Sequence, residues 1–201
     1  MKPRVPVPPG SDFPLENLPY GVFDPGDGPR LGVALGDHVV DLRITSAAGL
    51  LPYPAELAAP ALNPFLALGR PAWQETRAEL AELLSSDRFD RLPGDAVRER
   101  AAVRLCRPLD PGDYVDFYSS LHHATNLGKL FRPGDEPLHP NWRYLPVGYH
   151  GRASSIVVSG TPVRRPRGQV KPPDGPPRTA PTAAFDIELE VGFVTGPGNA
   201  L

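Results

Sequence analysis

Proline constrains this chain more than any other residue. Of the 201 residues, 28 are proline and a further 20 are glycine. Proline fixes φ and has no backbone N–H, so it is excluded from helix interiors and from central strands. This composition approaches that of disordered chains, but 40% of the residues are hydrophobic and the prolines cluster between apolar segments. The sequence therefore predicts a loop-rich, mainly β globular fold of the α+β type, with short disordered tracts.

Charge and cysteine content argue against several classes of protein. The formal net charge of -2 gives no reason to expect a nucleic acid or an anionic membrane as the main partner. A single cysteine, Cys106, excludes an internal disulfide framework and fits a reducing compartment. The N-terminus lacks the apolar segment of a signal peptide, and no apolar run reaches the roughly 18 residues of a membrane span. We expect a cytoplasmic protein that binds neither nucleic acid nor membranes.

Strand signals dominate the beginning of the chain. Residues 1–19 are expected to form an extended arm, and Tyr20–Asp24 has the composition of a strand. Two β-prone segments within residues 30–42 flank Gly36 and Asp37, a pair typical of a tight hairpin turn. The pattern predicts a small β-barrel with helical additions.

Two short helices and one longer helix are expected next. In one short helix Asn63 is the expected N-cap, proline follows at the first helical position, and Gly69 ends the helix. The longer helix is predicted over residues 71–86. Its apolar face is formed by Trp73, Leu80 and Leu84.

The composition changes near residues 107–111, where we place a boundary between two domains, 1–108 and 109–201. In the second domain, residues 155–163 predict a strand and a turn. Residues 164–181 form a proline-rich excursion that can be neither a helix nor a central strand. Its basic residues are expected to lie in a solvated loop rather than in a binding patch.

Residues 185–191, "FDIELEV", have the alternation of a strand. Asp186, Glu188 and Glu190 would share one face of that strand, with neighbouring carboxylates about 7 Å apart. Water and salt tolerate such repulsion on an exposed face, whereas a partly buried face requires a cation among the carboxylates. Taken alone, the strand favours a solvated outer face over a site for Mg²⁺ or Ca²⁺.

Residues 115–128, "VDFYSSLHHATNLG", add weight to the metal site. Asp116 could supply a third carboxylate, and a nearby histidine could act as a general base on water. Spacing does not choose between His122 and His123. The alternative is a polar loop followed by a helix, with structural histidines.

Four strings together resemble the fumarylacetoacetase family: "DFPLENLPYGVF", "GDYVDFYSSLHHATNLGKLFRP", "NWRYLPVGYHGRASSIVVSGTPVRRPRGQ" and "DIELEVGFVTGPGN". The resemblance runs from residue 12 to residue 201 and is strongest from Gly112 onward. It implies a small SH3-like β-barrel domain at the N-terminus, followed by a mixed-β catalytic domain that is incomplete here. It also implies a homodimer.

The resemblance assigns a role to each matching position. Asp116, Glu188 and Glu190 match the ligands of a divalent metal, Mg²⁺ or Ca²⁺. His123 matches the catalytic base, which resolves the choice left open above. The residues matched to substrate binding are Tyr118, Arg132 and Tyr149.

The chemistry implied by the resemblance is hydrolysis of a carbon–carbon bond in a diketo acid. The products are fumarate and acetoacetate, in the last step of tyrosine and phenylalanine degradation. The metal would polarise the carbonyl, and the base would activate water for attack on its carbon.

The family continues beyond the position of Leu201, with a further metal-binding aspartate and the groups that stabilise the alkoxide and orient the base. We therefore expect the 201-residue chain, taken alone, to be unstable or inactive. Two alternatives to a working fumarylacetoacetase remain. One is a non-catalytic remnant or assembly module, and the other is a relative that acts on another acylpyruvate-type substrate.

Overall fold

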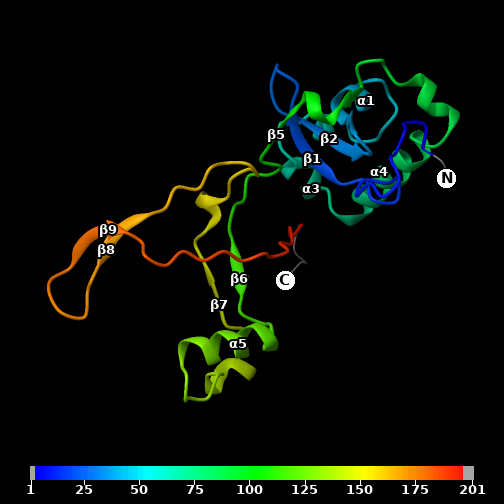
Figure 1. Ribbon diagram of the computed structural model, residues 1–201. Coiled ribbons are helices and arrows are strands. Elements are labelled where there is room, and N and C mark those ends of the chain that lie inside the picture. Colours follow the sequence, from blue (N-terminus) through cyan, green and yellow to red (C-terminus); the bar gives the residue numbers. More distant parts are fainter. Residues whose placement is uncertain (1–2, 197–201) are drawn as a thin grey trace. The chain divides into compact units, whose positions relative to one another are not determined.

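The computed structural model describes residues 3–196 of the chain. The chain divides into two compact units, which are coloured along the sequence in Figure 1. Unit 1 contains the residues up to Pro108 together with the segment from Val158 onward, and unit 2 contains Leu109–Val157. Each unit is described by itself below.

Unit 1 is built on a five-stranded antiparallel sheet with the order β4-β3-β2-β1-β5. Its apolar side chains form a continuous core: Phe23, Leu31, Val33, Leu35 and Val40 are all at most 1% exposed. The sheet is open and curled (Figure 1). Together with the helices described below, this antiparallel sheet gives the unit the expected α+β character. The strands are β1 (Tyr20–Asp24), β2 (Arg30–Leu35), β3 (His38–Asp41), β4 (Val97–Glu99) and β5 (Arg104–Cys106).

The predicted hairpin around Gly36 is confirmed, since β2 and β3 pair on either side of it. Gly36 has φ +56°, a left-handed conformation that glycine adopts without steric cost. Its N–H donates to the Phe13 carbonyl at 2.7 Å, and a Cβ at this position would lie 2.9 Å from the Pro6 carbonyl oxygen. The N-terminal arm therefore packs directly against the turn, which only glycine permits.

Helices cover the sheet in unit 1, and three short ones precede the long one where two were expected. They are α1 (Leu42–Ala47), α2 (Pro54–Leu57), α3 (Asn63–Ala67) and α4 (Arg70–Leu83), followed by the 3₁₀ turns η1 (Asp87–Arg91) and η2 (Arg100–Ala102). The N-cap of α3 is Leu62 rather than Asn63, so proline stands second in the helix. Gly69 follows Leu68, the C-cap of α3, with φ +83° and so ends this helix as predicted, and it is also the residue before α4. The predicted apolar face of α4 is confirmed at Leu80 and Leu84, both fully buried.

Asp41 joins a strand to a helix at the end of β3. Its carboxylate Oδ1 accepts the Ile44 N–H at 3.1 Å and so caps α1, while Oδ2 accepts Nη1 of Arg30 at 2.9 Å. The Asp41 side chain is completely buried, and that of Arg30 is 11% exposed. A buried carboxylate requires such partners, because desolvation without them is costly.

Unit 2 consists of a two-stranded ribbon, one helix and two 3₁₀ turns. Its elements are β6 (Val115–Phe117), α5 (Leu121–Phe131), η3 (Pro140–Arg143), β7 (Gly148–His150) and η4 (Ala153–Ser155). The segment after α5 packs closely on the helix, since a Cβ on Gly128 would overlap the Pro137 carbonyl. Glycine at this position thus lets the loop and helix approach.

Two strand predictions are wrong. Within the described residues no strand forms in 155–163 or in 185–191, although the turn predicted within 155–163 is confirmed by the hydrogen bond that the Thr161 N–H donates to the Val158 carbonyl at 3.2 Å. Ile187 and Leu189 are fully exposed, at 91% and 101%. Alternation marks a segment that can be a strand, but a strand exists only where a neighbour supplies hydrogen bonds.

The proline-rich excursion contains the one pairing in this region of the described chain, β8 (Arg167–Val170) with β9 (Arg178–Pro181). This two-stranded ribbon is not a central strand of a larger sheet, as predicted. In residues 3–196, no helix combines the length and the apolar character that crossing a bilayer requires.

Candidate active site

The ribbon of unit 2 brings Asp116 and Tyr149 together. In the β6–β7 register these two residues lie directly opposite each other, and side chains at such positions point to the same face. The Tyr149 hydroxyl donates to Asp116 Oδ2 at 2.8 Å. A residue predicted to ligate metal thus contacts a residue predicted to bind substrate.

Tyr118 follows β6 and is held through its backbone. Its N–H donates to the Val147 carbonyl at 2.8 Å, and its own carbonyl accepts the indole N–H of Trp142 at 2.8 Å. The Tyr118 hydroxyl donates to the Ala124 carbonyl at 3.2 Å, which ties the side chain to α5. Tyr118 is therefore fixed at both its backbone and its ring.

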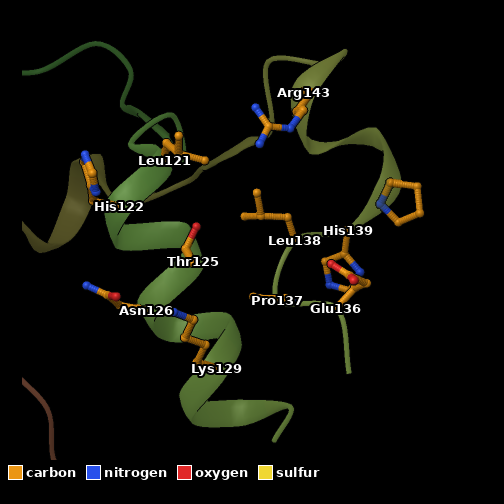
Figure 2. A pocket seen from close by; sticks show the side chains of 11 residues that line it. Leu121, His122, Thr125, Asn126, Lys129, Glu136, Pro137, Leu138, His139 and Arg143 are labelled. Carbon is orange, nitrogen blue, oxygen red and sulfur yellow. The ribbon is translucent and has the colours of Figure 1, made fainter. Parts of the chain in front are cut away.

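Helix α5 carries the two adjacent histidines. It begins after Ser120, whose hydroxyl accepts the His123 N–H at 3.4 Å as an N-cap. Consecutive residues of an α-helix point about 100° apart. The His123 ring makes an edge-on contact with the Tyr118 ring at a centroid distance of 5.7 Å. His122 instead lines a separate cavity (Figure 2).

Arg132 lies just after α5, where its backbone N–H donates to the Gly128 carbonyl at 2.9 Å. Its Nη2 donates to the Pro137 carbonyl at 2.7 Å. Its Nε is buried and has no hydrogen-bond partner within residues 3–196. A guanidinium with an unsatisfied buried N–H can donate a hydrogen bond to a further oxygen acceptor.

The three expected metal ligands are distributed over both units. Asp116 belongs to unit 2, whereas Glu188 and Glu190 belong to the extended exposed segment of unit 1. Among the residues that the structure describes, no three His, Cys, Asp or Glu side chains form a group that could hold a metal. The roles of all seven predicted site residues therefore stay predictions.

Trp142 is a residue of this site that the sequence did not suggest. Its indole N–H is partly buried and donates to the Tyr118 carbonyl. A buried indole usually finds an acceptor, but nothing in the sequence says that the acceptor would be a residue of the candidate site.

Comparison with known proteins gives a consistent set of matches. A family model described as "Fumarylacetoacetase N-terminal" matches residues 16–107. The fumarylacetoacetase of Homo sapiens is 49% identical over 98% of this chain and 50% of its own length. Those of Bos taurus and Oryza sativa subsp. japonica are 48% and 45% identical, each over 98% of this chain and 50% of the relative. The chain spans about half the length of these curated relatives.

Proposed function

Because the chain corresponds to the N-terminal region of the fumarylacetoacetase family, we propose that it serves the metal-dependent hydrolysis of a carbon–carbon bond in 4-fumarylacetoacetate. The observation that carries the proposal is the 49% identity to a curated fumarylacetoacetase, sustained over 98% of this chain. The reaction yields fumarate and acetoacetate, the last step of tyrosine and phenylalanine catabolism.

The donor set fits a hard divalent cation. Asp116, Glu188 and Glu190 offer only carboxylate oxygens, which Mg²⁺ and Ca²⁺ prefer. When bound, the ion would polarise the substrate carbonyl as a Lewis acid. The Tyr149 hydroxyl, 2.8 Å from Asp116 Oδ2, supports this assignment, because hydrogen bonds to a ligating carboxylate orient it toward the metal.

The remaining predicted residues position substrate and move a proton. His123 takes a proton from water as the water oxygen attacks the carbonyl carbon. The resulting alkoxide collapses, the carbon–carbon bond breaks, and the electron pair stays with the acetoacetate enolate, whose carbon then takes the proton held by His123. Arg132 binds a carboxylate of the substrate, while the hydroxyls of Tyr118 and Tyr149 orient its carbonyl groups.

The same proposal includes the fold and setting of the protein. Residues 1–108 are an SH3-like barrel domain, and residues 109–201 are the beginning of a mixed-β catalytic domain. The protein acts as a cytoplasmic homodimer. The curl of the antiparallel sheet of unit 1 (Figure 1) supports the barrel-like part of this description, while its edge strands β4 and β5 leave the sheet a half-barrel.

The experiment that tests the proposal is hydrolysis of fumarylacetoacetate by the whole protein purified from its native source, followed as loss of diketone absorbance, since the 201 residues taken alone are expected to be inactive. We expect turnover with Mg²⁺ or Ca²⁺, loss of turnover with a chelator, and a decrease of about 10²–10⁴-fold in His123→Asn. His150→Asn is the matched control, because His150 is also an exposed histidine of unit 2.

Two outcomes would contradict the proposal. A protein that is folded and loaded with metal but does not consume fumarylacetoacetate is not this hydrolase. Full turnover in His123→Asn, combined with loss of turnover in His122→Asn, would reverse the assignment of the base.

A further inference from the structure

Unit 2 contains a cavity that the proposed hydrolysis does not use. Its volume is about 580 Å³, which is in the range of small-molecule sites. None of the residues assigned above to metal, substrate or proton transfer lines it. The lining residues are Leu121, His122, Thr125, Asn126, Lys129, Glu136, Pro137, Leu138, His139, Pro140 and Arg143.

One wall of the cavity is a single face of α5. His122, Thr125, Asn126 and Lys129 are spaced at i, i+3, i+4 and i+7, so they lie on one side of the helix. His123 is offset from this face and contacts the Tyr118 ring instead. The cavity and the candidate active site therefore lie on different faces of the same helix.

The opposite wall is formed by residues 136–143. Figure 2 shows Leu138 and the Arg143 guanidinium directed toward α5, with Glu136 and His139 close together at the far side. The close packing of Pro137 on Gly128 holds this segment against the helix. The two walls thus belong to one unit and form a defined space.

The cavity has an excess of positive charge. Lys129 and Arg143 are cations, and Glu136 is the single acidic residue among those that line it. Within the described chain, the side chains of Lys129 and Arg143 have neither an ion-pair nor a hydrogen-bond partner. By contrast, Arg4, Arg30, Arg88 and Arg104 each contact a carboxylate.

From these observations we propose that the cavity binds a small organic oxyanion, with its carboxylate or phosphate group held by Arg143 and Lys129. A guanidinium matches both oxyanions through two parallel N–H donors, and an ammonium adds a point charge. The Thr125 hydroxyl and the Asn126 amide supply neutral donors. Leu138 and the neighbouring prolines provide an apolar surface for the carbon body of the ligand.

The test is calorimetric titration of the whole protein with inorganic phosphate and, separately, with succinate. Ionic strength is held constant, and a chelator is present so that no bound metal contributes an anion site. We expect one saturable site per chain with a dissociation constant of about 1 mM or tighter. Phosphate and succinate are compared because the cavity chemistry suits both, and binding of either one supports the proposal.

Variants assign the binding to the cavity. Arg143→Ala and Lys129→Ala should each weaken binding about tenfold or more, since each removes a charge-assisted contact. Arg143→Lys should lie between Arg143→Ala and the unchanged protein, because it keeps the charge but loses the planar fork. Arg178→Ala is the matched control: it removes the same charge from an exposed position in β9 and should leave binding unchanged.

Two results would overturn the proposal. One is the absence of saturable binding of both anions up to about 10 mM. The other is an equal loss in Arg178→Ala, which would mean that binding follows net charge rather than the cavity. The titration is carried out without metal and does not measure turnover. A negative result would therefore contradict the proposed anion site without bearing on the proposed hydrolysis. Lys129 and Arg143 are exposed, so their substitution leaves the core intact.

Discussion

Burial of the Tyr20 hydroxyl group destabilises the folded state. Its ring packs beside Phe65 at a centroid distance of 5.4 Å. Its hydroxyl is buried and has no hydrogen-bond partner within residues 3–196. Burial raises the pKa of this phenol to about 12, because the charged phenolate would be poorly solvated.

This environment predicts a pH dependence of stability. The unfolded chain releases the Tyr20 proton near pH 10, whereas the folded chain keeps it until about pH 12. The free energy of unfolding is therefore unaffected by Tyr20 ionisation below about pH 10, and it decreases as the pH rises from about 10 to about 12. We expect Tyr20→Phe to remove this decrease at high pH. Because it also removes a buried hydroxyl without a partner, it should raise the free energy of unfolding near neutral pH by up to about 1 kcal/mol.

The measurement is urea unfolding of both proteins at neutral pH and at about pH 11. Tyr144→Phe is the control, since Tyr144 is 81% exposed and should change neither value. A lower free energy of unfolding for Tyr20→Phe at neutral pH would contradict this prediction, because it would mean that the hydroxyl makes a stabilising hydrogen bond.

At the scale of elements, Asp41 connects β2, β3 and α1. It caps α1 through the Ile44 N–H and forms a buried ion pair with Arg30 of β2. Removing one partner of a buried pair leaves the other charge uncompensated, which typically costs about 3–5 kcal/mol. We predict a loss of that size for Asp41→Ala and a smaller loss for Asp41→Asn, which keeps a capping oxygen.

A control for Asp41 uses the same arginine. Arg30 also contacts Asp27, whose side chain is 63% exposed, and exposed ion pairs contribute less than about 1 kcal/mol. Urea unfolding of Asp27→Ala should thus show a small change. Equal losses in Asp27→Ala and Asp41→Ala would mean that burial does not decide the strength of these contacts.

At the scale of the whole molecule, the proposed metal would take its ligands from segments far apart in the sequence. Asp116 lies in unit 2, and Glu188 and Glu190 lie in unit 1. A ligand that binds only the folded arrangement stabilises it by about 2.7 kcal/mol at 100 times its dissociation constant. We predict that Mg²⁺ or Ca²⁺ raises the unfolding temperature of the protein and that Glu188→Gln abolishes the rise.

Asp186→Asn is the matched control for the metal prediction. Asp186 lies in the same exposed segment, but it is not assigned as a ligand, so the rise in unfolding temperature should persist. Thermal unfolding is compared in chelator and in excess metal. A rise that persists in Glu188→Gln, or that is lost equally in Asp186→Asn, would contradict the assigned ligand set.

Sequence patterns predicted the structure correctly where that structure depends on residues close together in the sequence. The β2–β3 hairpin was predictable because Gly36 permits the left-handed turn between two β-prone segments. The apolar face of α4 was predictable because helical spacing alone aligns Leu80 with Leu84. Helix ends were less accurate: α3 begins at Asn63 rather than after it, since neighbouring residues compete for the cap.

Contacts between distant segments were not predictable in this way. Residues 185–191 alternate as a strand should, yet pairing depends on a neighbour that alternation does not specify. His122 and His123 could not be distinguished by spacing. The fold separates them, because adjacent helical residues diverge and only His123 contacts the Tyr118 ring.

The sequence by itself determined the hairpin of unit 1, its amphipathic helix and the similarity to fumarylacetoacetases, because turn chemistry, periodicity and motifs are local properties of the chain. Only the tertiary structure decided that Tyr149 contacts Asp116 and that residues 136–143 pack on α5 to form an open cationic cavity. The first contact joins residues 33 positions apart, and the second joins a helix to the loop that follows it. Backbone pairing and packing create them, and no short segment encodes either one alone.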